Sequence, residues 1–218
     1  METDCWISIV VTNFNYSSFL GRCIESCLSQ DLKSDQFEIV VVDDASTDSS
    51  REVLSGFGAD PQVQVVLRDQ NGGVAAAAND GIRRATGEFV TRVDADDAVV
   101  PSFARKLAQR LRTAPAAFCV CCDYRTVDPA GATLGTFSAR THPISCGVMY
   151  RRNRLMEAGL YDPLWRHLEE EELRGRLGYQ YSIEYVDEVL YDYLRHDRNK
   201  TLDTSALASY RKRLETGS

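Results

Sequence analysis

The feature that most constrains this chain is a short extended run that ends in carboxylates. Residues 89–93 read Phe-Val-Thr-Arg-Val, which suits a β-strand, and Asp94, Asp96 and Asp97 follow directly. Open α/β sheets bind ligands beyond the carboxyl ends of their strands. Alternate residues of an extended chain point the same way, so we expect Asp94 and Asp96 to face one site.

Two carboxylates that face one site repel each other unless a cation or hydrogen-bond donors compensate their charge. Hard divalent cations prefer oxygen ligands and often bridge to phosphates. The segment therefore predicts an Asp-x-Asp site for a metal ion and a nucleotide. The alternative is a polar turn that caps the helix after Pro101, because short Asp-rich turns are common.

A second strand end repeats this pattern. The apolar run at 37–42 stops at Asp43 and Asp44, and Ala-Ser-Thr-Asp follows. The carboxyl ends of parallel strands lie at one edge of a sheet. Two acidic strand ends are therefore better evidence for a site than either turn alone.

The first part of the chain alternates apolar runs with amphipathic segments. We expect strands at 7–12, 37–42, 63–67 and 89–93, and helices at 18–30, about 46–54 and 74–85. This alternation predicts a parallel sheet with right-handed crossovers. Ser17 or Ser18 is expected to cap the first helix, and the alanine-rich third helix is expected to pack closely on the sheet.

The second part has shorter elements. We expect helices at 101–111, 151–158 and 169–177, strands at 118–124, 133–137, 147–150, 182–186 and 189–193, and a polar tail after 200 that is helical or frayed. Four glutamates open the 169–177 segment, which suits the positive end of a helix dipole. We find no repeat and no interdomain linker, so one domain over 1–218 is expected.

Composition excludes some functions. The net charge is −7 over 218 residues, which argues against a general nucleic-acid binder. No apolar run approaches the roughly 18–20 residues that span a bilayer, and the first residues lack a secretory leader. We expect a cytoplasmic protein with at most peripheral contact to the inner face of the membrane. Homo-oligomerisation stays open.

The seven cysteines include Cys119, Cys121 and Cys122. They lack a second pair at zinc spacing, so a soft-metal or redox protein has little support. An odd number of cysteines without a secretory signal fits a reducing compartment. We interpret the three close cysteines as small side chains in a buried strand.

Taken in order, these segments resemble a family 2 glycosyltransferase of the GT-A fold, from about residue 7 to about residue 201. The matching pieces are Val-Val-Thr-Asn-Phe-Asn-Tyr at 10–16, residues 37–48, residues 71–74 with 79–81, residues 87–97, and residues 145–152 with 159–163. The resemblance implies a Rossmann-like, mostly parallel central sheet flanked by helices, with a small C-terminal subregion on the acceptor side. Residues 1–97 would form the nucleotide-sugar half, 98–200 the acceptor half, and 201–218 a tail.

The resemblance also implies an activity. Such enzymes use Mn²⁺ or Mg²⁺ and transfer a sugar from a nucleoside diphosphate, most often UDP, with inversion at the anomeric carbon. The acceptor would be a hydroxyl of a saccharide or of a lipid-linked saccharide, as in surface polysaccharide or glycan synthesis. A base must take the hydroxyl proton, and the charge on the leaving diphosphate must be stabilised.

The residue roles follow from the matched positions. The implied donor-binding residues are Thr12, Phe14, Asn15, Asp43, Asp44, Asn71, Gly73, Asp94, Arg195, Arg198 and Lys200. Asp44 would bind the nucleobase and Asp94 the ribose or the sugar. Asp96 and His196 would ligate the metal, whereas Asp97 would be a helix cap or a support for the site. Relatives often have arginine where this chain has Ala78, so one donor contact is missing.

The resemblance places the base at the start of the 169–177 helix. The family has a Glu-Asp pair there, followed by Leu and Arg at the spacing of Leu173 and Arg176. This register makes Glu170 the candidate base, with Glu169 as the alternative within the glutamate run. Glutamate replaces the family's aspartate, and its side chain is one methylene longer.

Two other classes of protein share parts of this pattern. A nucleotidyltransferase or sugar-nucleotide pyrophosphorylase would need a glycine-rich loop with Arg or Lys after the first strand. This chain has Thr-Asn-Phe-Asn-Tyr at 12–16 instead. A non-catalytic GT-A domain that binds nucleotide or serves as a scaffold is the remaining alternative, because of Ala78 and the replaced aspartate.

Overall fold

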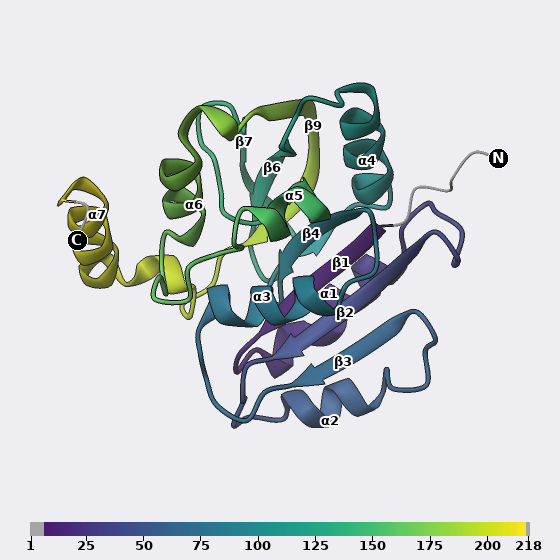
Figure 1. Cartoon of the computed structure of the whole chain (residues 1–218). Coiled ribbons are helices and arrows are strands. Elements are labelled where there is room, and N and C mark those ends of the chain that lie inside the picture. Colours follow the sequence, from purple (N-terminus) through teal and green to yellow (C-terminus); the bar gives the residue numbers. More distant parts are fainter. Residues whose placement is uncertain (1–6, 217–218) are drawn as a thin grey trace.

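The computed structural model describes residues 7–216, except the side chain of Lys200, and shows a central sheet with helices on both faces (Figure 1). The strands are β1 (Ile7–Asn13), β2 (Phe37–Asp43), β3 (Val63–Leu67), β4 (Phe89–Asp94), β5 (Ala98–Val99), β6 (Cys119–Val127), β7 (Thr133–Phe137), β8 (Val148–Arg151) and β9 (Ile183–Leu194). The helices are α1 (Ser17–Leu28), α2 (Ser50–Ser55), α3 (Val74–Arg84), α4 (Phe103–Thr113), α5 (Arg152–Glu157), α6 (Glu169–Leu177) and α7 (Thr204–Thr216).

The sheet has a parallel half and a mixed half. Its strand order is β3-β2-β1-β4-β8-β6-β9-β5, with β7 paired to β6 as a hairpin. The first four strands are parallel, as predicted. Strand β8 is antiparallel to both β4 and β6, and β9 is parallel to β6. The α/β alternation of the first part therefore accounts for half of the sheet.

The strand register brings the two acidic strand ends together. Asn13 is paired with Asp43, and Thr12 is paired with Asp94. The carboxyl ends of β1, β2 and β4 thus meet at one edge, which confirms the prediction made from the two carboxylate-ending runs.

The core lies in two layers because successive residues of a strand point to opposite faces. On β1, Ile9 and Val11 pack in the layer that holds α1 and α4. Val10 points the other way, toward Ala75 and Ala78 of α3. All five side chains are fully buried. The close packing predicted for the alanine-rich helix is confirmed.

Two local expectations were wrong. The residue at the N-cap of α1 is Tyr16, without a side-chain cap. The backbone N–H of Ser17 instead donates to the carboxylate of Asp48, at 2.9 Å. The two short strands expected at 182–186 and 189–193 are one strand, β9. Its pairing with β6 shifts register around Asp123, so a bulge replaces the expected break.

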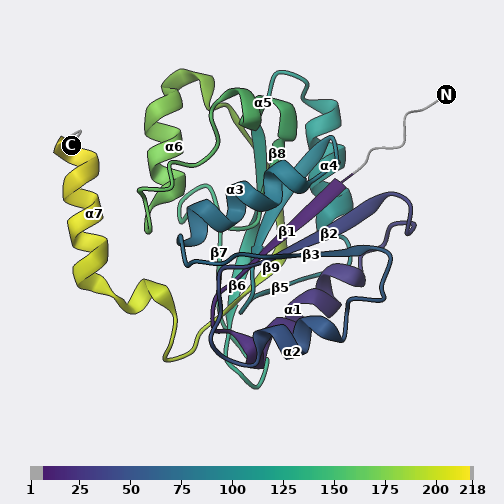
Figure 2. The same ribbon diagram turned by 60° about the horizontal axis from the view of Figure 1, so that its bottom comes forward.

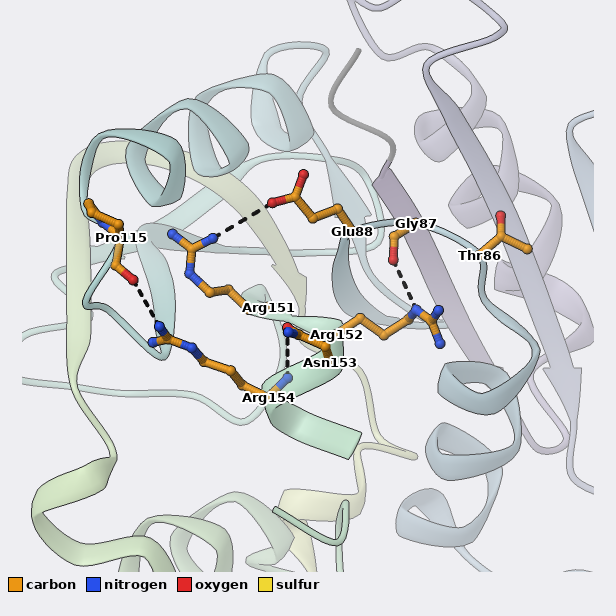
Figure 3. Close-up of a pocket in the computed structure, with 8 residues that line it drawn as sticks. All are labelled: Thr86, Gly87, Glu88, Pro115, Arg151, Arg152, Asn153 and Arg154. Atoms are coloured by element: carbon orange, nitrogen blue, oxygen red, sulfur yellow. Dashed lines mark hydrogen bonds and ion pairs between the residues drawn. The ribbon is translucent and has the colours of Figure 1, made fainter. Parts of the chain in front are cut away.

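Three arginines lie near the start of α5 (Figure 3), and Arg151 is paired with Phe89 at the end of β4 that lies away from Asp94. Arg151 and Arg154 donate to backbone carbonyls at and after the end of α4, including that of Ala114 from Arg151 at 3.3 Å and that of Ala116 from Arg154 at 3.0 Å. Arg152 donates to the carbonyl of Gly87, just before β4, at 2.9 Å. These contacts satisfy carbonyls that a helix end leaves open.

Helix α7 stands beside α6 and away from the sheet in both views (Figures 1 and 2). Tyr210 packs against Trp165 and His167 in the loop that leads to α6, with ring centroids 5.6 and 5.4 Å away. The tail is therefore helical. Among the described residues, no helix combines the length and the apolar character that crossing a bilayer requires.

Candidate active site

A cavity of about 1000 Å³ opens at the carboxyl ends of β1, β2 and β4. Its lining includes ten of the predicted site residues: Thr12, Phe14, Asp44, Asn71, Gly73, Asp94, Asp96, Glu169, Arg195 and Arg198. Four others lie behind the lining: Asn15, Asp43, Glu170 and His196. The side chain of Lys200 lies outside the described residues.

Asp43 and Asp44 have different surroundings although they are adjacent. Asp43 is fully buried. It accepts hydrogen bonds from the Asn13 side chain at 2.8 Å and from the backbone N–H of Ser46 at 3.1 Å, so it fixes the turn after β2. Asp44 faces the cavity. Its carboxylate therefore lies on the cavity side of the turn, whereas that of Asp43 is enclosed within it.

Backbone amides surround the Asp44 carboxylate. The N–H of Gly72 donates to Oδ1 at 2.9 Å, and that of Gly73 donates to Oδ2 at 2.8 Å. Arg68 also donates to Oδ1. Gly73 has a φ of +87°, which favours glycine. An ionised carboxylate has about four acceptor positions, so Oδ2 can still accept from a nucleobase N–H.

Residues after β1 support the same turn from the other side. Asn15 has a φ of +59°, and its Oδ1 accepts from the backbone N–H of Thr47 at 2.8 Å. It positions the loop without lining the cavity. Phe14 lines the cavity and is 41% exposed, which suits stacking on a planar base. Thr12 donates to Asp94 Oδ1 at 3.2 Å.

Asp96 is held by the segment after β9. The Nε2 atom of His196 lies 3.0 Å from Asp96 Oδ2, and the Asn199 side chain donates to the same oxygen at 3.4 Å. Burial, followed by the Asp94 carboxylate, raises the pKa of Asp96. Close carboxylates with a raised pKa favour a bound cation.

The environment of His196 bears on its role as a metal ligand. Its Nδ1 accepts from the backbone N–H of Arg198 at 3.2 Å, so in the neutral ring the proton lies on Nε2, facing Asp96. A cation held by Nε2 would need the other tautomer and would replace the direct contact with Asp96. Asp96 and His196 are close enough to share an ion, and the ring is fixed by packing on Phe19, with centroids 4.6 Å apart.

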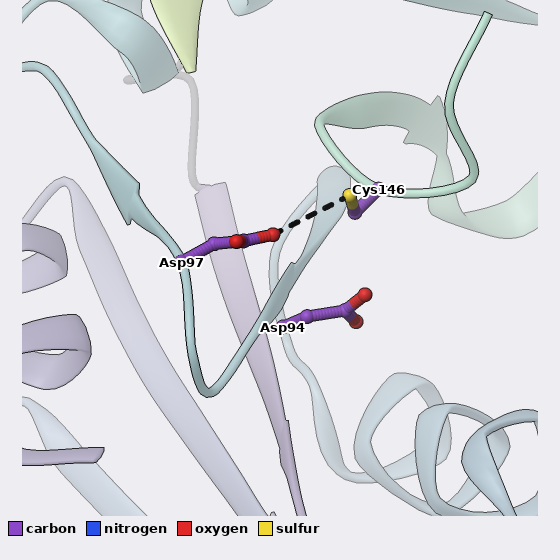
Figure 4. A group of neighbouring side chains, drawn as sticks. All are labelled: Asp94, Asp97 and Cys146. Atoms are coloured by element: carbon purple, nitrogen blue, oxygen red, sulfur yellow. Dashed lines mark hydrogen bonds between the residues drawn. The ribbon is translucent and has the colours of Figure 1, made fainter. Parts of the chain in front are cut away.

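A second group of ligand-type atoms also lines the cavity (Figure 4). Asp94, Asp97 and Cys146 each bring one such atom within 4.8 Å of the others. Asp97 already accepts from the Tyr191 hydroxyl at 2.7 Å and from the backbone N–H of Leu194 at 2.9 Å.

Burial, then the charges of Asp94 and Asp97, raises the pKa of the Cys146 thiol, so it stays protonated. A neutral thiol is a poor ligand for hard cations. Asp97 supports the loop and does not cap α4, whose N-cap residue Ser102 has no side-chain cap. We therefore place the candidate cation at Asp96.

Glu169 is the first residue of α6 and lines the cavity. It is 4% exposed. Its Oε1 accepts a hydrogen bond from Arg92 Nη1 at 2.8 Å. Arg92 Nε lies 3.2 Å from Asp94 Oδ1, so one guanidinium bridges two carboxylates that line the cavity.

Glu170 is enclosed by protein. It is 1% exposed. The Tyr150 hydroxyl donates to it at 2.6 Å, and Tyr181 also donates to it. Arg174 lies 3.6 Å away as an ion pair. These contacts anchor the first turn of α6 in the core.

The segment after β9 folds over the cavity. The Tyr16 hydroxyl donates to the carbonyl of Arg198 at 3.0 Å, and the Arg198 guanidinium lies over the Tyr16 and Phe19 rings. Arg195 also lines the cavity. Two cationic side chains thus line the same cavity as Asp96.

The fold and these carboxylates define a GT-A architecture, in which a parallel half-sheet carries an acidic cavity at its carboxyl edge. The chain matches the family Glycosyl transferase family 2 over residues 8–167 and belongs to that family. It is similar to the succinoglycan biosynthesis protein ExoO of Rhizobium meliloti, with 31% identity over 83% of this chain and 53% of that protein.

Solved structures agree with this fold. S. aureus TarS in complex with UDP-GlcNAc has a TM-score of 0.78 and 20% identity, covering 91% of this chain and 61% of that one. The mannosyltransferase PcManGT of Pyrobaculum calidifontis, in complex with GDP-Man and Mn²⁺, has a TM-score of 0.71 and 20% identity, covering 93% and 60%. The chain thus spans between half and two thirds of these proteins.

Some residues of the site were not predicted. Arg92 carried a usable signal, because a charge inside an apolar strand needs a buried partner. Arg166 carried none. Its guanidinium reaches from the loop before α6 to Asn71, where Nη1 donates to the side-chain oxygen at 3.2 Å. It therefore links the acceptor half of the cavity to the donor loop.

Proposed function

We propose that this chain is a metal-dependent inverting glycosyltransferase that moves a sugar from a nucleoside diphosphate, first of all UDP, to a hydroxyl of a saccharide or lipid-linked acceptor. The carrying observation is that Asp94, the last residue of β4, and Asp96 line one cavity together with Glu169, the first residue of α6. We place the donor in the half formed by residues 1–97 and the acceptor in the half formed by 98–200. Synthesis of a surface polysaccharide or glycan is the proposed context.

The donor would lie along the ends of β1, β2 and β4. Phe14 is placed to stack on the nucleobase, and Oδ2 of Asp44 can accept from a base N–H. Uracil, thymine and guanine each offer such an N–H beside a carbonyl. Arg195 and Arg198 are placed to bind diphosphate oxygens.

The donor set fits a hard divalent cation, because Asp96 offers an anionic oxygen and His196 an imidazole at 3.0 Å from it. Mn²⁺ accepts such a mixed set more readily than Mg²⁺. When bound, the cation would neutralise charge that develops on the leaving diphosphate.

The reaction itself needs a base and a free path to the anomeric carbon. We assign the base to Glu169 within the Glu169–Glu170 pair, because Glu169 lines the cavity and Glu170 does not. Arg92 takes Oε1, which leaves Oε2 for the acceptor hydroxyl. The proton of the acceptor hydroxyl passes to Glu169 while the hydroxyl oxygen forms a bond to the anomeric carbon. The bond from that carbon to the diphosphate breaks, and inversion follows from attack on the opposite face.

The test compares three glutamine variants of α6. Glu169→Gln should lower kcat by at least about 100-fold, the usual contribution of a base. The kcat is measured for sugar transfer or for hydrolysis of the donor by water. Binding of the nucleoside diphosphate should persist. Glu172→Gln is the matched control, since Glu172 pairs with Arg176 at 2.7 Å and does not line the cavity. Glu170→Gln should lower the melting temperature, and it should reduce kcat much less than Glu169→Gln does. A loss of turnover in Glu170→Gln alone, with an unchanged melting temperature, would contradict the assignment.

A non-catalytic nucleotide-binding domain is the second candidate. Ala78 favours it, since this small side chain is fully buried in the core where relatives often have an arginine. Such a domain would bind a nucleoside diphosphate yet hydrolyse none of the UDP-, dTDP- or GDP-sugars.

The cytoplasmic location, with peripheral contact to the inner face of the membrane, and homo-oligomerisation stay predictions.

A further inference from the structure

Arg92 is a charged residue inside a buried strand. It lies on β4 two residues before Asp94, and it is 4% exposed. Burying a guanidinium is costly unless its charge is paired and its N–H groups are used. Arg92 pairs its charge with two carboxylates: Nη1 donates to Glu169 Oε1 at 2.8 Å, and Nε lies 3.2 Å from Asp94 Oδ1 as an ion pair without a hydrogen bond. Its guanidinium also lies 5.8 Å from the centre of the Tyr161 ring.

The surroundings keep this arginine charged. Burial acts to lower the pKa of Arg92, but the carboxylates of Asp94 and Glu169 act the other way, and the net direction is upward. The arginine therefore keeps its positive charge beside the two carboxylates. Arg92 compensates part of the repulsion between carboxylates that face one cavity.

This contact lies at the start of α6. Leu168 precedes the helix with a φ of +58°, in the left-handed region, and no side chain caps the first turn. Glu169 is the first helical residue, and Arg92 holds it across 77 residues of sequence. The same arginine lines the cavity. A purely structural ion pair would not need to line the cavity. Nor would it need to join Asp94, on the proposed donor side, to Glu169, on the proposed acceptor side.

We propose that Arg92 is a positioning residue for the transfer: it holds the Glu169 carboxylate toward the acceptor and ties it to Asp94 at the donor. This inference rests on the proposed function, in which Glu169 is the base. In that role Arg92 occupies Oε1, so that the remaining oxygen meets the hydroxyl, and it touches no substrate itself. Strand β4 and helix α6 thereby share one electrostatic link between the two halves of the cavity.

The experiment uses Arg92→Lys and Arg92→Met in the full chain. Kinetics of sugar transfer or donor hydrolysis give kcat and the donor KM. Calorimetry gives the affinity for UDP in the presence of Mn²⁺, and thermal melts give the stability. Arg92→Met should lower kcat by about 100-fold, as loss of a positioned base does, and change UDP affinity less than threefold. Arg92→Lys, which keeps the charge, should recover about tenfold of that loss. Arg110→Met is the control, because Arg110 pairs with Glu184 at 2.6 Å on a more exposed face.

The double variant Arg92→Met with Glu169→Gln separates positioning from folding. If Arg92 acts through Glu169, the double variant is no slower than Glu169→Gln alone. Losses that multiply, or a wild-type kcat in Arg92→Met, would overturn the inference. If Arg92→Met does not fold, Arg92→Lys carries the test, and a lysine variant as slow as Glu169→Gln would overturn it. An active Glu169→Gln single variant would instead refute the proposed base, which is a distinct result.

Discussion

Adjacent acidic residues of this chain have unlike surroundings. Glu169 faces the cavity, whereas Glu170 is enclosed by Tyr150 and Tyr181. Asp43 and Asp44 are both buried, but only Asp44 lines the cavity. A pair of acids can therefore hold the backbone with one member and offer the other to a ligand. The motif in the sequence marks the pair, but the packing of neighbouring elements decides which member is available.

Asp48 is a carboxylate whose role is structural. Its Oδ2 accepts from the Ser17 N–H at the start of α1, and its Oδ1 accepts from the N–H of Ser50 at the start of α2, at 3.0 Å. Burial acts to raise the pKa of Asp48, yet the hydrogen bonds from Ser50 and Ser17 lower it overall. One side chain thus serves two helix starts, where an anion is favourable.

We predict that Asp48→Ala lowers the free energy of unfolding by about 1–2 kcal/mol at pH 7, as loss of a helix cap does. The folded-state pKa is depressed, so this stabilisation is present above the unfolded pKa of about 3.9 and is lost as the pH falls through the lower folded value. Urea denaturation of both proteins from pH 8 to pH 3 checks this. Asp35→Ala, an exposed carboxylate before β2, is the control. A difference that grows on acidification would contradict the account.

At the scale of elements, α3 shows how small residues set the distance between layers. A Cβ atom at Gly81 would lie 2.4 Å from Val10 Cγ1 and 3.1 Å from Val42 Cγ2. Neither valine can move without disturbing β1 or β2, since both are fully buried. The helix therefore lies as close to the sheet as its backbone allows, and its N-terminal residues reach the cavity.

We predict that Gly81→Ala costs about 2 kcal/mol of unfolding free energy through overpacking. Gly175→Ala in α6 is the matched change, because no heavy atom lies within 4 Å of its added Cβ. That variant should be neutral or up to about 1 kcal/mol more stable, since alanine is the better helix former. Denaturant titrations of both proteins give the comparison, and equal effects would mean that the close approach of α3 is not real.

The parallel half of the sheet was predictable because its signals are local. The β-branched run at residues 7–12 and the carboxylate-ending run at 89–93 each indicate a buried strand of a parallel sheet. They also indicate which end of the strand carries polar residues. The mixed half was not. Strand β8 joins β4 antiparallel, and β9 passes the bulge near Asp123 without a break. Such pairings are set by contacts between distant segments, and no short pattern encodes them.

For the whole molecule, the site depends on segments more than 70 residues apart. The sequence placed Asp44, Asp94 and Asp96 at one edge, because strand ends of a parallel sheet share it. The sequence did not decide whether Glu169 or Glu170 is the candidate base, because a run of four glutamates can be aligned with the family's Glu-Asp pair in more than one way. That choice depends on which face of α6 packs on the sheet.

The central claim is a nucleotide and metal site at the end of β4. The measurement is calorimetric titration of UDP, dTDP and GDP, each with and without Mn²⁺, into the wild type and Asp96→Ala. We predict that one nucleotide binds tightly only with Mn²⁺, and that Asp96→Ala weakens this binding by at least about tenfold, the scale of losing a metal contact. Asp60→Ala, in the loop before β3, is the control. Binding that is equal with and without the metal in both proteins, or no binding of any nucleotide, would contradict the claim.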